Sequence, residues 1–357
     1  MSKNPNNNRS ALTSLHAPWD NNDNVIWLSS TVRLCRNIEK FKFPHKMESE
    51  RKAHLLQLIS NHYLQSTSLK DPLLLKGEEM APHEKEFLIE HFFLSEGFQE
   101  AHEGSAFSVD KTGELIALFN IKDHLQLQCT DTSGDLEKAY SRVMTIENEI
   151  GKSLNFAFNT KFGFLTGDPL HCGTGLIVSS YLHIPALIHT KSLTDALEKE
   201  KSEGIVASGL QGNPDELVGD ILMLRNLYTL GVNEESILST MRSAIMHIVV
   251  AEKGIRTRIK QEKMPLFKDL ISRACGSLKF SYQIEAPEAL SQISLLKLGL
   301  ELGWVKGMSI KEVNSLFIDS RRSHLSYLLG ETVLAADIST KRAEFLRKKT
   351  EGILIEF

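Results

Sequence analysis

The chain has 357 residues, and its 41 Lys and Arg against 45 Asp and Glu leave a formal net charge of −4. This near-balance argues against a protein that holds nucleic acid by bulk charge. Hydrophobic residues make up an ordinary 41% of the chain, and no stretch reaches the roughly 20 apolar residues of a membrane span. The polar start lacks the apolar core of a signal peptide, and the four cysteines form no CxxC pair. The sequence therefore predicts a soluble, cytoplasmic protein with no metal site and no nucleic-acid or membrane partner.

After a flexible leader over residues 1–20, the first part of the chain mixes helical and strand patterns. Apolar residues at helical spacing predict helices over Ser49–Leu64 and Glu84–Leu94. Two strands flank the turn Asp110–Gly113, and a third strand with alternating apolar residues follows, so an antiparallel meander is expected over 105–109, 114–119 and 123–129. A polar helix and five short strands then follow, over 133–150, 156–158, 162–165, 176–182, 205–206 and 221–228.

From Asn233 onward the pattern is helical. Asn233 can cap a helix that has Glu234 and Glu235 in its first turn and reaches at least Lys253. Five more helices are expected over 265–278, 287–302, 309–317, 321–328 and 339–349. The predicted fold is α+β: a leader over 1–20, a domain over 21–255 with an antiparallel sheet flanked by helices, and an all-helical domain over 256–357 for dimerisation or regulation. The leucine-rich run 295–302 suits either helix packing or a subunit interface.

Four segments stand out because small, polar and Gly residues interrupt apolar runs. They are Leu28–Arg36, Asn120–His124, Leu165–Gly175 and Ala207–Gly212, each at or beside a predicted strand end. Gly-rich turns in such places can present backbone N–H groups to phosphate. A Gly-Thr-Gly run alone is more often only a turn, but the four segments together resemble the ATP:guanido phosphotransferases, the creatine and arginine kinase family. The resemblance is greatest to the bacterial protein-arginine kinases and covers about Asn24 to Arg347.

The resemblance implies phosphoryl transfer from ATP with magnesium to arginine side chains of proteins. Catalysis in this family is mostly positioning and cationic stabilisation, and its members use a cage of arginines for it. Two glutamates pin the acceptor guanidinium and help to remove its proton. The family positions that contact the nucleotide correspond here to Ser29, Ser30, Arg33, His91, Gly173, Thr174 and Gly175.

Several family positions hold other residue types in this chain. The positions of four cage arginines hold Thr31, Gln126, Ile177 and Ser208, and those of the two glutamates hold Lys122 and Asn213. The motif cysteine is replaced by Asp168. Losing one preorganised donor commonly costs about 10²–10³ in rate, and Lys122 would repel an incoming guanidinium. The expectation is a chain that keeps the fold and has lost efficient arginine phosphorylation.

Three functions follow as expectations. The first is a degenerate or weakly active relative that regulates protein quality control, with partners implied by the resemblance: a zinc-containing activator protein, a Clp-type chaperone-protease and a second copy of the chain. The second is an active protein-arginine kinase that clamps ATP with Arg33, Arg36, Lys122 and the amides of 173–175. Whether distant arginines such as Arg225, Arg256 or Arg258 fold into the pocket and rebuild the cage stays open at the level of sequence. The third is a dimeric scaffold that binds no nucleotide.

Two smaller questions remain open at the level of sequence. Asp168, His171 and Cys172 share one loop and either support acid–base chemistry or form an ordinary turn with a packed thiol. Arg33 and Arg36 either contact a nucleotide or pair with carboxylates. In the tail, the bacterial relatives carry an Arg-Asp-x-x-Arg-Ala motif that reads phosphoarginine, and Ile338–Ala343 lacks its leading Arg-Asp pair.

Overall fold

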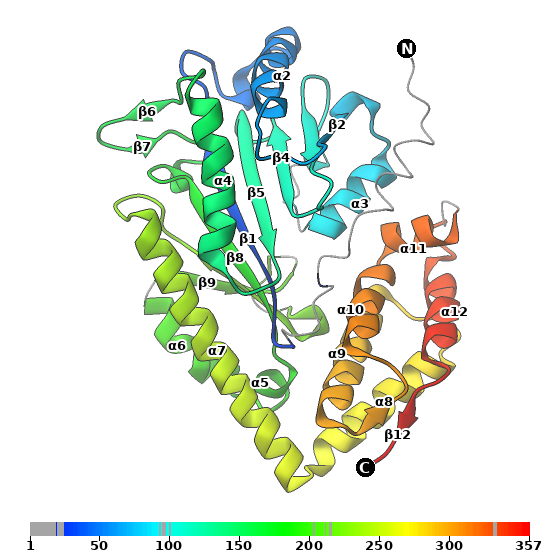
Figure 1. Ribbon diagram of the computed structural model, residues 1–357. Coiled ribbons are helices and arrows are strands. Elements are labelled where there is room, and N and C mark those ends of the chain that lie inside the picture. Colours follow the sequence, from blue (N-terminus) through cyan, green and yellow to red (C-terminus); the bar gives the residue numbers. More distant parts are fainter. Residues whose placement is uncertain are drawn as a thin grey trace. The chain divides into compact units, whose positions relative to one another are not determined.

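The computed structural model describes residues 19, 25–92, 94, 98–99, 101–202, 204–210, 212–213, 216–330 and 334–357 (Figure 1). The chain divides into two compact units. Unit 1 contains Ser29–Ser179 and Arg225–Arg242, and unit 2 contains Trp19–Leu28, Ser180–Leu224 and Ser243–Phe357. The predicted leader falls almost entirely outside the described residues. Within the part of the chain that the structure describes, no helix has the length and apolar character needed to cross a membrane.

Eight strands form one sheet in the order β2-β3-β4-β5-β1-β8-β10-β9. Their bounds are β1 Trp27–Arg36, β2 Leu73–Lys76, β3 Ala106–Val109, β4 Leu115–Phe119, β5 Leu125–Asp131, β8 Leu176–His183, β9 Ile205–Ser208 and β10 Ile221–Asn226. Strands β3, β4 and β5 pair antiparallel in sequence order, which confirms the predicted meander. Gly113, at φ +72°, closes its first turn by donating its N–H to the Asp110 carbonyl at 2.9 Å.

In unit 1, helices α2 (Ser49–Leu64), α3 (Pro82–Phe92) and α4 (Leu136–Gly151) accompany the strands. Figure 1 shows α4 alongside β5. Asp135 caps α4, since its carboxylate accepts the Lys138 N–H at 2.9 Å. A short hairpin, β6 (Phe158–Asn159) with β7 (Gly163–Phe164), follows α4. Three-residue 3₁₀ helices lie at 44–46, 77–79 and 169–171.

Unit 2 is mainly helical. Its helices are α5 (Pro185–His189), α6 (Leu193–Ser202), the part of α7 (Glu234–Glu262) from Ser243, α8 (Pro265–Phe280), α9 (Ala286–Leu302), α10 (Ile310–Asp319), α11 (Arg322–Leu329) and α12 (Ile338–Thr350). Helix α9 is buried along most of its length because α8 and α10 both pack against it. Ser309 and Glu312 form a capping box at the start of α10. The N-terminal part of α7 belongs to unit 1, where Asn233 caps the helix as predicted by accepting the Ser236 N–H at 2.8 Å.

The predicted α+β fold is confirmed, with local corrections. Helix α2 has the predicted bounds, whereas α3 ends two residues before the predicted Leu94 and β10 ends at Asn226. The tail is not wholly helical, because β11 (Val305–Lys306) pairs with β12 (Leu354–Ile355). Strands β1 and β2 and helices α5 and α6 were not expected. Strand β1 has neighbours on both sides in the sheet and is almost wholly buried, so it lacks the apolar–polar alternation of a half-buried strand.

Candidate functional site

Asp123 joins three segments of unit 1. One of its carboxylate oxygens accepts the Asn37 side-chain amide and the Gly167 N–H, both at 2.6 Å, and the other accepts the Gln126 amide at 3.1 Å. The side chain is 2% exposed. Asp123 is therefore occupied in fixing the end of β1 and the start of β5 against the loop at 165–168. Asn37, which sequence reasoning did not single out, is the partner that lies just past β1.

His124 is fixed in one neutral tautomer. Its Nδ1 accepts the Ile38 N–H at 2.9 Å, so its Nε2 carries the proton that faces the Lys42 carbonyl at 2.8 Å. Burial of the ring is the main reason that the pKa of His124 lies below its ordinary value. The Asp-His pair of the second motif thus has a structural role in this chain.

The Gly-Thr-Gly loop is held by backbone hydrogen bonds. The N–H groups of Gly173 and Thr174 donate to the carbonyls of Phe164 (3.1 Å) and Thr229 (2.9 Å). Gly173 has φ +106°, and a Cβ there would lie 2.2 Å from the Thr229 carbonyl oxygen. A Cβ on Gly175, at φ +64°, would lie 2.7 Å from the Cys35 carbonyl oxygen. Close backbone packing explains both glycines, and two of the three amides predicted to cradle phosphate already have acceptors.

Arg33 and Arg36 have different environments. The Arg33 guanidinium is half-buried and donates twice to the Gln128 side-chain oxygen, at 2.9 and 2.6 Å. Arg36 is 1% exposed, and its Nε lies 2.7 Å from a Glu147 carboxylate oxygen. The charge of Arg36 is therefore already paired with a carboxylate of α4, and its role in clamping ATP stays a prediction. Among the residues that the structure describes, Arg36 pairs with a carboxylate and Arg33 does not.

The other predicted nucleotide contacts, Ser29, Ser30 and His91, are buried in unit 1. The two serines are at most 1% exposed. His91 is 3% exposed, and its ring contacts those of Phe87 and Phe92, with centroids at 5.4 and 4.7 Å. Their nucleotide-binding role stays a prediction.

All four positions that resemble cage arginines are neutral and less than a tenth exposed: Thr31, Gln126, Ile177 and Ser208. The Ser208 hydroxyl is buried without a hydrogen-bond partner among the described residues. The two positions that resemble the catalytic glutamates are exposed instead, and hold Lys122 in unit 1 and Asn213 in unit 2.

The loop with Asp168, His171 and Cys172 forms a capped turn. The Asp168 carboxylate accepts the Leu170 N–H at 3.0 Å and lies 3.9 Å from the His171 ring. Burial is the main reason that the pKa of His171 lies below its ordinary value. The Asp168 carboxylate opposes this shift, and the charge of Arg225 adds to it. Arg225 therefore lies near this loop. Among the described residues, no group of three or more His, Cys, Asp or Glu side chains could hold a metal ion.

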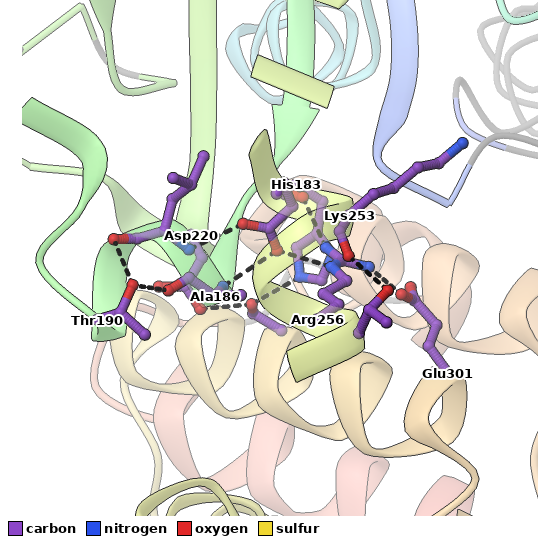
Figure 2. Close-up of polar contacts among 11 residues, drawn as sticks. His183, Ala186, Thr190, Asp220, Lys253, Arg256 and Glu301 are labelled. Carbon is purple, nitrogen blue, oxygen red and sulfur yellow. Dashed lines mark hydrogen bonds and ion pairs between the residues drawn. The ribbon is translucent and has the colours of Figure 1, made fainter. Parts of the chain in front are cut away.

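Of the distant arginines, Arg256 belongs to a buried ion network in unit 2. Its Nε lies 2.6 Å from a Glu252 oxygen, its Nη1 contacts Glu301, and its Nη2 donates to the His183 carbonyl at 2.8 Å (Figure 2). Glu252 also accepts the Ala186 N–H at 3.0 Å. Arg256 is thus committed to joining α7, α9 and the end of β8, whereas Arg258 is exposed.

The tail arginine Arg342 is also committed to structure. It is 2% exposed and donates to the carbonyls of Ser320 and Ile284, at 2.8 and 2.9 Å. Its guanidinium ties α12 to the end of α10 and to the segment before α9.

Comparisons with known proteins agree with the motifs. Residues 52–255 match the ATP:guanido phosphotransferase C-terminal catalytic domain, and residues 265–354 match the protein-arginine kinase McsB C-terminal domain. The chain belongs to the ATP:guanido phosphotransferase family. It is 34% identical to the protein-arginine kinase of Chlamydia pneumoniae, covering 92% of this chain and 93% of the relative. It is 30% identical to that of Halalkalibacterium halodurans, covering 93% and 95%.

Solved structures show the same fold. The substrate-free duplicated taurocyamine kinase from Schistosoma mansoni matches with a TM-score of 0.58 and 24% identity, over 73% of this chain and 39% of that chain. Lombricine kinase matches with a TM-score of 0.57 and 15% identity, over 69% and 71%. These likenesses confirm the guanido-kinase fold of this family member.

Proposed function

We propose that this family member has lost efficient phosphoryl transfer and acts as a regulatory protein of the protein-arginine kinase branch. The observation that carries the proposal is the small number of cationic donors at the family's nucleotide positions. Four cage positions are neutral and buried, Arg36 is neutralised by Glu147, and Arg33 is shared with Gln128. A magnesium-bound triphosphate needs several guanidinium or amide donors, and these residues do not fit that requirement.

The size of the expected loss also supports the proposal. An arginine that acts on the transferring phosphoryl group contributes roughly 10³–10⁵ in rate, and a general base about 10²–10⁴. These contributions are not additive. Even so, the replacement of four arginines and two glutamates would remove most of an enzyme's usual acceleration.

A second candidate is an active protein-arginine kinase. It is favoured because the relatives that match over more than nine-tenths of the chain carry that name. The charges of Arg225 and Arg33 also favour it, since both help to lower the pKa of His171 in this loop. In this candidate Arg225 supplies part of the positive charge that the motif positions lack.

One assay separates the two candidates. The purified chain is incubated with Mg-ATP and an arginine-rich protein, and phosphoarginine is measured by acid-labile phosphate and mass spectrometry. The regulatory proposal predicts no phosphoarginine above a protein-free control. Phosphoarginine that forms catalytically and disappears in the Arg33→Ala and Arg225→Ala variants would establish the active kinase instead.

Nucleotide binding distinguishes a sensing regulator from a nucleotide-free scaffold. A ligand at 100 times its Kd stabilises the folded state by about 2.7 kcal/mol. A thermal-shift titration with Mg-ATP that shows no rise in Tm favours the scaffold, and a rise without phosphoryl transfer favours a nucleotide-sensing regulator.

The remaining parts of the proposal come from the family alone. They are a cytoplasmic location, a homodimer built by the helical tail, and partnership with a zinc-containing activator protein and a Clp-type chaperone-protease. The commitment of Arg342 to backbone carbonyls supports a tail that does not read phosphoarginine. Analytical ultracentrifugation of the chain tests the dimer.

A further inference from the structure

A groove of about 700 Å³ lies between the N-terminal parts of α4 and α7, within unit 1. Glu137 and Tyr140 line it from α4, and Glu234, Glu235 and Arg242 line it from α7. Three carboxylates against one guanidinium give these lining residues a net charge of −2. The groove thus combines negative charge with an aromatic ring, and none of its residues belongs to the family motifs.

Two of its carboxylates are available to a ligand. Arg242 is paired with Glu137, and its Nε lies 3.2 Å from a Glu137 oxygen. Glu234 and Glu235 have no cationic partner within the described part of the chain. Glu234 and Tyr140 line the same groove, and the charge of Glu234 adds to burial in raising the pKa of the Tyr140 phenol. A cation in the groove would therefore meet an aromatic residue and negative charge.

An exposed apolar segment, residues 227–232, leads directly into this groove. Leu227, Tyr228, Leu230 and Val232 are 41%, 59%, 48% and 40% exposed. The next three residues, 233–235, are groove residues. Leu170, which is 71% exposed, belongs to the loop against which this segment is held. Contiguous exposed apolar side chains of this kind mark interaction surfaces in folded proteins.

The segment 227–232 is anchored to the body of unit 1. The Thr229 hydroxyl contacts the carbonyls of Cys172 and Leu170, at 2.7 and 3.0 Å, and the Thr229 carbonyl accepts the Thr174 N–H. The Asn226 side-chain amide donates to the Tyr228 carbonyl at 3.0 Å. These bonds hold Thr229 inward while the neighbouring apolar side chains face outward, so the surface is formed before any partner arrives.

We propose that segment 227–232 and the α4–α7 groove together bind a protein segment that carries large apolar side chains beside arginine. The apolar side chains lie on 227–232, and the arginine enters the groove. Arginine suits the groove because its planar guanidinium stacks on aromatic faces and pairs with carboxylates. The net charge of the groove disfavours nucleic acid and anionic membranes. This inference rests on the proposed regulatory function, because it names the chemistry of the partner that the regulatory protein binds.

The test measures binding to the full chain without nucleotide, so its result is independent of phosphoryl transfer. The probe is a short fluorescein-labelled peptide of leucine, arginine and alanine, followed by fluorescence anisotropy. Two matched peptides replace every arginine with glutamate or every leucine with serine. We expect saturable binding of the first peptide and at least about tenfold weaker binding of the other two. Equal binding of the glutamate peptide, or no binding of the first, overturns the proposal.

Variants locate the binding surface. Glu234→Gln combined with Glu235→Gln, and separately Leu230→Ser combined with Val232→Ser, should each weaken binding about tenfold or more. The matched control is Glu78→Gln with Glu79→Gln, an exposed acidic pair in the 3₁₀ helix at 77–79. Tm is measured for each variant to confirm folding. Wild-type affinity in both groove and segment variants, or an equal loss in the control, contradicts the proposed surface.

Discussion

At the scale of single residues, hydrogen-bond commitments decide what each motif position can do. Arg33 and Arg36 have the residue type that the family chemistry uses, but each is already bonded to a neighbour in unit 1. Gly173 and Gly175 likewise serve close backbone packing. A residue type in a motif therefore sets what a position is able to bind, and its tertiary contacts set what it does bind.

Gly173→Ala should lower stability markedly. The new Cβ would meet the Thr229 carbonyl oxygen at 2.2 Å in addition to the strain of φ +106°. We expect a loss of about 2–4 kcal/mol, measured by urea denaturation, because overpacking and a left-handed backbone each cost on the order of 1–3 kcal/mol. Gly212→Ala is the control, since Gly212 has φ +82° with nothing within 4 Å of its Cβ position. Equal losses in the two variants would rule out the packing explanation.

At the scale of elements, one buried ion pair joins β1 to α4. The Arg36 guanidinium also donates to the Thr174 carbonyl at 2.9 Å and lies 3.6 Å from the centre of the Phe164 ring. One side chain thus ties β1, α4, the Gly-Thr-Gly loop and β7 together. Burying a charge is costly unless it is paired, so this arrangement depends on Glu147.

Arg36→Met should destabilise unit 1 strongly, because it leaves the Glu147 carboxylate buried without its cation. The expected loss is about 3–5 kcal/mol in the free energy of unfolding. Adding Glu147→Leu should recover part of that loss. Lys111→Met removes an exposed pair with Asp71 and should cost less than about 1 kcal/mol. If the double variant is no more stable than Arg36→Met, the uncompensated carboxylate is not the cause.

At the scale of the whole molecule, buried ionisable groups link stability to pH. Lys297 on α9 is 4% exposed, and its Nζ has no hydrogen-bond partner among the described residues. Burial lowers the pKa of Lys297 to about 7, Glu301 opposes the shift, and Arg256 adds to it. The unfolded chain therefore binds more protons than the folded one between about pH 7 and the ordinary lysine pKa. The contribution of Lys297 to the free energy of unfolding therefore rises with pH across that window.

Lys297→Met should stabilise the protein, most of all below pH 7. The stability difference between the variant and the wild type should shrink by about 2–3 kcal/mol from pH 6 to pH 9, because each unit of pKa shift corresponds to about 1.4 kcal/mol. Thermal or urea unfolding over this pH range measures the difference. The exposed Lys260, replaced by Met, serves as the control and should show no such trend. A difference that is constant with pH would contradict the role of Lys297.

The sequence by itself determined the family, the α+β order of elements and the residue types at each motif position. These features are local or follow from motif order, as in the meander around Asp110–Gly113 and the helix capped by Asn233. Only the tertiary structure decided which donors are already used. The partners of Arg33 and Arg36 lie 95 and 111 residues away along the chain, in Gln128 and Glu147. No periodicity or spacing brings such pairs together, because their contact depends on how the strands and helices pack.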